Sequence, residues 1–185
     1  MQLKINSNVT KITLAAMLLA LAWVLPFLTG QIPEIGRMLL PMHIPAFLAG
    51  LLLGPKYGLM LGFLMPITRS LIFTMPPIYP TATAMAFELA AYGFFSGLLF
   101  YYLNQYKLRF IVNVYISLLV AMLAGRIVWG LVYSMLGLFG NLFTFQMFIT
   151  GALIIAWPGM IVQCIIIPIV MQTLKHAELL DALPE

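Results

Sequence analysis

The sequence predicts an all-α, polytopic membrane protein with six transmembrane helices and both termini in the cytoplasm. Of its 185 residues, 63% are hydrophobic and 8% are charged, which is about a third of the charged share of an average soluble domain. Runs such as Leu14–Leu28 and Ile161–Met171 are apolar on every face, as is typical of helices in lipid and not of β-barrel strands. Since each span needs about 20 residues, the chain has room for about six spans in a single membrane domain, residues 1–185.

Six apolar segments are predicted to be the spans. They cover residues 10–28, 41–53, 57–74, 81–103, 110–139 and 148–174. The second is short, and Pro41 and Pro45 flank His43, so we expect it to begin as irregular chain or to form a partial span. In the sixth, Trp157-Pro158-Gly159 should produce a kink, because proline removes a backbone donor and clashes with the preceding turn. Pro168 should add a second break.

The orientation follows from the lysine and arginine residues in short loops, which favour the cytoplasmic side. If the N terminus is inside, only Arg37 lies in an outer loop. The residues on the cytoplasmic side are Lys4, Lys11, Lys56, Lys107, Arg109 and Lys175. Six against one predicts that both termini are cytoplasmic.

Four ionisable residues, His43, Arg69, Glu88 and Arg126, lie in these apolar segments. Such side chains are costly in hydrocarbon unless they are paired, hydrated or facing a cavity, so they are candidates for a functional site. At 1.5 Å per helical residue, the predicted topology places all four in the outer half of the membrane. Tyr92 lies one helical turn from Glu88 on the same face.

Aromatic residues add to this candidate site. Arg126, Trp129 and Tyr133 are spaced so that they share one face of the fifth span. Tyr79 lies in the proline-rich connection of residues 74–83, which proline makes stiff. Aromatic walls with a few fixed polar groups are typical of a small-ligand pocket.

The charge balance divides the four residues into two roles. Glu88 is the only deep acid for two deep arginines, so one cation needs another partner. Pairing Arg69 with Glu88, as a structural ion pair between adjacent spans, is the simplest arrangement and leaves Arg126 for an anion of the ligand. For His43 the alternative to ligand binding is a hydrogen bond to the backbone at the start of its helix.

The motifs of common enzymes are missing from the sequence. It has no GxxxxGK[ST] loop for a nucleotide, no HExxH zinc motif and no GxSxG elbow, and Cys164 is its single cysteine. We therefore expect no enzyme activity, no cofactor and no metal site. Without an energy source of its own, a site in the outer leaflet indicates a binding subunit that relies on partners for transport.

Small residues predict two close helix approaches. Ala16 and Ala20 form a small-xxx-small face on the first span, which allows another helix to come near in lipid. Glycines between the second and third spans, at positions 50, 54, 58 and 62, favour packing within an internal hairpin.

Two central blocks resemble a known family. LLPMHIPAFLAGLLLGPKYGLMLGF (Leu39–Phe63) and MPPIYPTATAMAFELAAYGFFSGLL (Met75–Leu99) are similar to the substrate-binding membrane subunits, or S-components, of energy-coupling factor (ECF) vitamin transporters. The resemblance implies a subunit of the bacterial plasma membrane that captures a water-soluble vitamin from outside. It also implies a transmembrane coupling subunit, against which Ala16 and Ala20 would dock, and two cytoplasmic ATPases.

The blocks are similar to the branch with pantothenate-, pyridoxine- and hydroxymethylpyrimidine-type subunits. The cation left over favours an acid, because arginine binds a carboxylate bidentately, and pantothenate also has hydroxyls and an amide that His43, Tyr79 and Asn141 could serve. A flat, neutral pyridoxine or pyrimidine would instead stack on Trp129 and Tyr133. Two other classes stay open: a structural membrane subunit that binds no small molecule, and a stand-alone facilitator.

Overall fold

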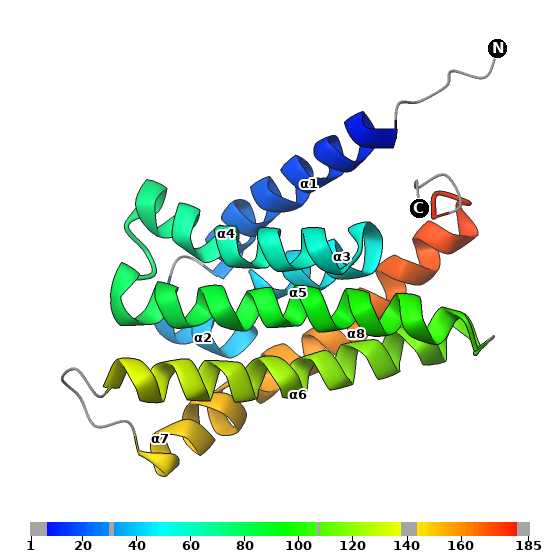
Figure 1. The fold of residues 1–185 in the computed structure, drawn as a ribbon. Helices are drawn as coiled ribbons and strands as arrows, with labels where there is room; N and C mark the ends of the chain where they lie inside the picture. Colours follow the sequence, from blue (N-terminus) through cyan, green and yellow to red (C-terminus); the bar gives the residue numbers. More distant parts are fainter. Residues whose placement is uncertain (1–6, 30–31, 107, 138–143, 181–185) are drawn as a thin grey trace.

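The described residues of the computed structural model, 7–29, 32–106, 108–137 and 144–180, are helical apart from short connections. The two longest helices run side by side along the bundle, and the helical segments of seven residues or fewer lie near one of its ends (Figure 1). In chain order the elements are α1 (Ser7–Val24), η1 (Leu25–Thr29), α2 (Pro33–Leu39), α3 (His43–Leu53), α4 (Pro55–Phe73), η2 (Ile78–Ala82), α5 (Thr83–Asn104), α6 (Phe110–Gly137), α7 (Phe145–Ile149), η3 (Thr150–Ile155) and α8 (Trp157–His176).

Four of the described helical segments are long and apolar enough to cross a membrane. They are Asn8–Thr29, Ile78–Asn104, Phe110–Gly137 and Trp157–His176. The other two predicted spans correspond to α3 and α4. Helix α3 has 11 residues, or about 16 Å at 1.5 Å per residue, which is about half of the hydrocarbon thickness. The finding supports a multi-pass membrane protein, and the number of crossings stays a prediction.

Glycines bring α3, α4 and α5 into backbone contact. A Cβ atom on Gly50 or Gly58 would overlap the Gly93 carbonyl, and one on Gly93 would overlap the Gly58 backbone. The α3–α4 turn passes through Gly54 at φ 89°, a conformation that glycine adopts without strain. The predicted internal hairpin is confirmed, and α1, α5 and α8 also pack against α3, whose residues are all buried.

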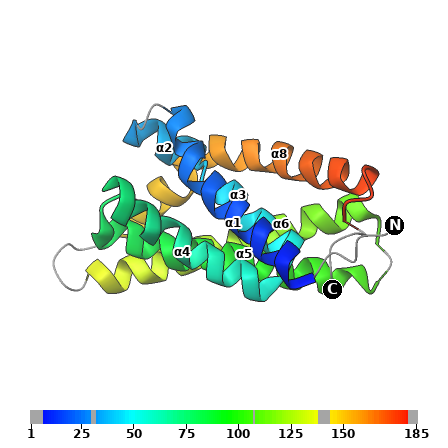
Figure 2. The ribbon, with the colours of Figure 1, turned by 90° about the horizontal axis from the view of Figure 1, so that it is seen from above.

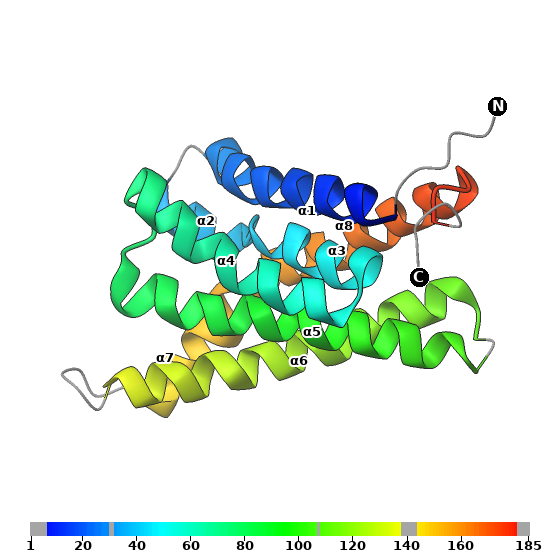
Figure 3. The same ribbon diagram turned by 45° about the horizontal axis from the view of Figure 1, so that its top comes forward.

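The two ends of the bundle differ in what they contain. The beginning of α1, the end of α5 and the end of α8 lie at one end (Figures 2 and 3). The opposite end contains α2, the end of α4, the end of α6 and α7. The start of α3 and the deep ionisable residues lie in the half of the bundle that is nearer to this second end.

The predicted sixth span consists of three consecutive helical segments. Segments α7 and η3 end at a turn at Ala156, and α8 begins at Trp157 with Pro158 in its first turn, so the predicted kink is confirmed. The second predicted break is wrong, since α8 continues through Pro168. Pro168 is buried, and packing against neighbouring helices lets a membrane helix tolerate proline.

Helix α2 is an element that hydropathy did not predict. It begins at Pro33, which suits the first turn of a helix, and it packs against α8. The contact is close because Gly159 leaves room for the backbone of Met38 and Leu39. Helix α2 thereby closes one side of the end that contains the candidate site.

Candidate functional site

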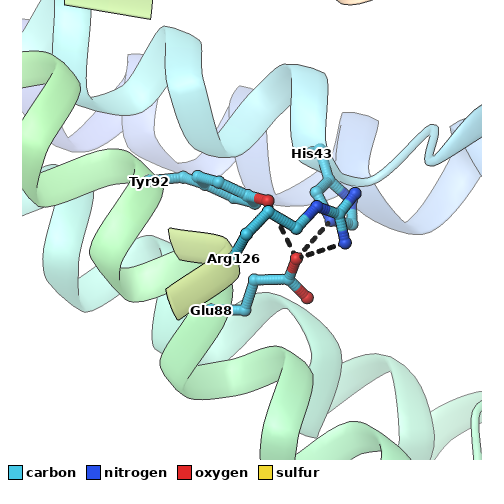
Figure 4. Close-up of polar contacts among 4 residues, drawn as sticks. All are labelled: His43, Glu88, Tyr92 and Arg126. Carbon is cyan, nitrogen blue, oxygen red and sulfur yellow. Dashed lines mark hydrogen bonds and ion pairs between the residues drawn. The ribbon is translucent and has the colours of Figure 1, made fainter. Parts of the chain in front are cut away.

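Glu88 is the centre of a buried polar cluster with contributions from three helices. Its Oε1 atom accepts hydrogen bonds from Arg126 Nη1 and from the Tyr92 hydroxyl, each at 2.8 Å. The same oxygen lies 3.6 Å from His43 Nε2. Figure 4 shows His43 and Arg126 on one side of the carboxylate and Tyr92 beside them.

The positions follow from helix geometry. His43 is the first residue of α3, whereas Glu88 and Tyr92 are one turn apart on α5, so their side chains lie on one face. Helix α5 packs against both α3 and α6, and Gly125, next to Arg126, makes room for the Tyr92 ring. The predicted shared face of Glu88 and Tyr92 is confirmed.

The cluster is desolvated but keeps hydrogen-bonding capacity. His43 is 1% exposed, Glu88 2% and Arg126 8%, and the ion pair offsets the penalty of burying two charges. Both ring nitrogens of His43 and the Nε of Arg126 are buried without a hydrogen-bond partner in the described part of the chain. Since buried polar atoms are normally hydrogen-bonded, these atoms suit a polar ligand.

The hydrogen bond and the ring contacts of Arg69 involve residues outside this cluster. The side chain comes from α4, is 3% exposed, and donates from Nη1 to the Trp23 carbonyl of α1 at 2.6 Å. The guanidinium carbon is 5.4 Å from the ring centroids of both Phe27 and Phe73, within the range of cation–π attraction.

The expected pair between Arg69 and Glu88 is therefore wrong. Within the described residues, the ion-pair partner of Glu88 is Arg126, and His43 Nε2 lies 3.6 Å from the same carboxylate oxygen. Distance along a helix gives the depth of a side chain in the membrane, but it does not give the direction in which that side chain points. Arg126 and Glu88 face each other because α5 and α6 pack side by side.

A cavity of about 840 Å³ adjoins the cluster, within the usual range of roughly 300–1,000 Å³ for small-molecule sites. Six of the eight residues predicted to bind substrate lie in its lining: His43, Arg69, Glu88, Arg126, Trp129 and Tyr133. The arrangement brings cations, an acid, a histidine and aromatic rings to one space. It can bind a small molecule with both charged and uncharged polar groups.

An aromatic wall forms one side of this cavity. The rings of Trp129 and Tyr133 have centroids 5.2 Å apart, and Trp129 stacks on Phe148 with centroids 6.2 Å apart. Gly130 and Gly151 leave the space that Phe148 and Trp129 occupy. A flat group of a ligand would find apolar surface here.

Of the eight predicted residues, Tyr79 is described but does not lie in the lining. Tyr79 is exposed, and its hydroxyl donates to the Leu136 carbonyl at 2.9 Å, so it connects η2 to the end of α6. Asn141 lies outside the described residues.

The proline-rich connection of residues 74–83, expected from the sequence to line the mouth of the site, contributes Met75, Pro76, Pro77 and Thr81 to the lining. The lining also includes residues that the sequence did not point to. They come from η1, from α2 and the residue after it, and from the α7–η3 region: Thr29, Gly36, Leu40, Thr144, Gln146, Met147, Thr150 and Gly151. A signal existed for Gln146 and Thr150, since they are one helical turn apart in an apolar region. No hydropathy signal pointed to α2.

The predicted docking residues Ala16 and Ala20 are both exposed on α1. Their neighbours on this surface, Ile12 and Met17, are each 63% exposed. In a membrane this face meets lipid or another helix.

A helical bundle with apolar outer faces and a mostly apolar cavity beside a buried polar cluster is the arrangement expected of a substrate-binding membrane protein. The family model of the ECF transporter, substrate-specific component, matches residues 10–173, which is most of the chain. The chain belongs to this family. Searches of curated proteins and of solved structures returned no match.

Membership defines the class of activity. The protein is a substrate-specific subunit of an ECF transporter, and such subunits bind substrate in the membrane and are not catalysts. Among the described residues, no group of three histidine, cysteine, aspartate or glutamate side chains could hold a metal ion.

Proposed function

We propose that the chain captures a water-soluble vitamin, with pantothenate favoured, from outside the cell membrane for ATP-driven uptake with partner subunits. The observation that carries this proposal is the cavity of about 840 Å³ with buried, incompletely bonded polar atoms of His43 and Arg126. A pocket used only for packing between helices would be filled by apolar side chains.

Pantothenate is favoured over other vitamins by charge. Two arginines and one glutamate are the charged residues among the described lining, so an acid would balance the site. A specific observation favours the alternative, a pyridoxine- or hydroxymethylpyrimidine-type vitamin: Trp129, which lines the cavity, is stacked on Phe148, and a flat ring of a ligand could stack on Trp129 from the cavity.

The experiment is a binding titration of the purified, detergent-solubilised chain with pantothenate, pyridoxine and hydroxymethylpyrimidine. Mass spectrometry of ligand that co-purifies with the chain provides an independent identification. Saturable binding of one vitamin supports the proposal. Absence of binding to all of them, with a folded chain, would favour a structural subunit. Uptake by liposomes that contain only this chain would instead indicate a facilitator.

For transport, we propose docking of the exposed Ala16 and Ala20 face on a transmembrane coupling subunit that works with two cytoplasmic ATPases. Small residues allow close helix approach, so Ala16→Trp with Ala20→Trp should abolish co-purification with the coupling subunit and leave vitamin binding unchanged. Leu131→Trp on α6, where the side chain is 61% exposed, is the matched control. Equal loss with the control would contradict the assignment.

The proposal includes one membrane domain with six crossings and both termini in the cytoplasm. Since Cys164 is the single cysteine, Cys164→Ser provides a background for labelling. Glu34→Cys should react with an impermeant thiol reagent in intact cells, and Glu178→Cys only after permeabilisation. The reverse pattern would invert the topology.

A further inference from the structure

The described lining of the cavity contains one more cation than acid. Among the described lining residues, the charged ones are Arg69, Glu88 and Arg126. The hydrogen bond of 2.8 Å between Arg126 Nη1 and Glu88 Oε1 makes these two an internally neutral pair. The excess positive charge therefore lies on Arg69.

Arg69 has only neutral partners in the described part of the chain. It donates one hydrogen bond to the Trp23 carbonyl and lies over Phe27 and Phe73, whereas no described carboxylate is within ion-pairing distance of it. A guanidinium has five N–H donors in a planar fork. The donors that Trp23 does not use match the two oxygens of a carboxylate.

The neutral pair of Arg126 and Glu88 is suited to uncharged polar groups of a ligand. In the described part of the chain, the ring nitrogens of His43 and the Nε of Arg126 are buried and have no hydrogen-bond partner. The two hydrogen bonds that Glu88 accepts, and its 3.6 Å approach to His43, all involve Oε1. Donors and acceptors around a pair that is already neutral suit hydroxyl or amide groups, which satisfy hydrogen bonds without adding charge.

We propose that the ligand is a monocarboxylate with a separate uncharged polar group. The carboxylate contacts Arg69, and the uncharged group contacts His43 and Arg126. The inference rests on the proposed vitamin-binding function and names its substrate class. It reverses the roles expected from the sequence, in which Arg126 met the anion. A neutral ligand would leave Arg69 without a counter-charge, and a dianion would leave the site with net negative charge.

The test uses two pairs of probes that differ in one carboxylate. Pantothenate is compared with pantothenol, and 4-pyridoxate with pyridoxine, by isothermal titration of the full chain in detergent. In at least one pair the acid should bind at least about tenfold more tightly than its neutral counterpart, as expected for a desolvated charge pair. This comparison needs no variant.

Variants then assign the charge preference to one residue. Arg69→Gln should weaken acid binding at least about tenfold while the neutral counterpart changes by no more than about twofold, and Arg69→Lys should retain the preference in part. Arg126→Gln should weaken the acid and its neutral counterpart alike. Arg109→Gln, which removes an exposed cation outside the cavity, should change neither.

The outcomes separate this inference from the proposed function. If a probe binds but in neither pair does the acid bind more tightly than its neutral counterpart, the monocarboxylate class is wrong while vitamin binding stands. If Arg69→Gln keeps the acid preference and Arg126→Gln removes it, the anion site is Arg126. If no probe binds to the folded wild type, the proposed function fails and the inference fails with it.

Discussion

Removal of the Glu88 charge should expose how strongly the buried cluster depends on it. Glu88→Gln keeps the shape of the side chain but leaves Arg126, 8% exposed, without its counter-ion at 2.8 Å. Breaking a buried ion pair on one side costs about 3–5 kcal/mol. Because 1.4 kcal/mol is about tenfold, the unfolding equilibrium constant should rise by a factor of roughly a hundred or more.

A double-mutant cycle measures the pair itself. Arg126→Gln alone should also be destabilising, because Glu88 would keep only Tyr92 and His43 as neighbours. The double variant removes both charges, so its loss should be smaller than the sum of the single losses. We expect a coupling energy of about 2–3 kcal/mol, near the upper end for contacting residues.

The assay is unfolding of the ligand-free chain in mixed micelles, followed by circular dichroism. Glu178→Gln, at an exposed carboxylate after α8, is the control and should change the free energy by no more than about 0.5 kcal/mol. A second cycle between Glu88 and Arg69 should be additive within about 0.5 kcal/mol. A larger coupling to Arg69 than to Arg126 would refute the assignment of the pair.

Two further predictions use the same assay. Gly93→Ala should destabilise the chain by about 1–3 kcal/mol, because the new Cβ would overlap the Gly58 backbone, whereas Gly36→Ala meets nothing nearer than 4.0 Å and should be tolerated. Trp23→Phe should cost about 1 kcal/mol, because it removes the hydrogen bond of 3.0 Å from Trp23 Nε1 to Thr68 Oγ1; an unchanged free energy of unfolding would show that this bond contributes nothing.

The sequence could predict what depends on composition and on position along one helix. Apolar runs indicated the helices, and helical spacing placed Glu88 with Tyr92 and Trp129 with Tyr133, as their contacts confirm. The break before Trp157 followed from proline chemistry. These features are local, so they needed no knowledge of how helices are arranged around one another.

The predictions that were wrong depended on how the helices are arranged around one another. The partner of Glu88 is set by how α4, α5 and α6 are rotated about their axes, and the depth of Arg69 carried no information on this. Helix α2 and the α7–η3 region were missed because short segments give a weak hydropathy signal. They contribute much of the lining, including Gly36 and Gln146, so the sequence indicated the polar centre of the site and not its enclosure.

The position of Trp23 connects vitamin binding with docking on the coupling subunit. Successive residues of α4 contact Trp23, Thr68 at the indole nitrogen and Arg69 at the carbonyl. Trp23 lies on the same helix as the exposed Ala20 and Ala16, one and two turns after them. A carboxylate bound to the remaining donors of Arg69 would fix the position of this side chain, and with it the contact to the Trp23 carbonyl of α1. If so, a coupling subunit that binds α1 changes the affinity for the vitamin. By thermodynamic reciprocity, the vitamin changes the affinity for the coupling subunit by the same factor.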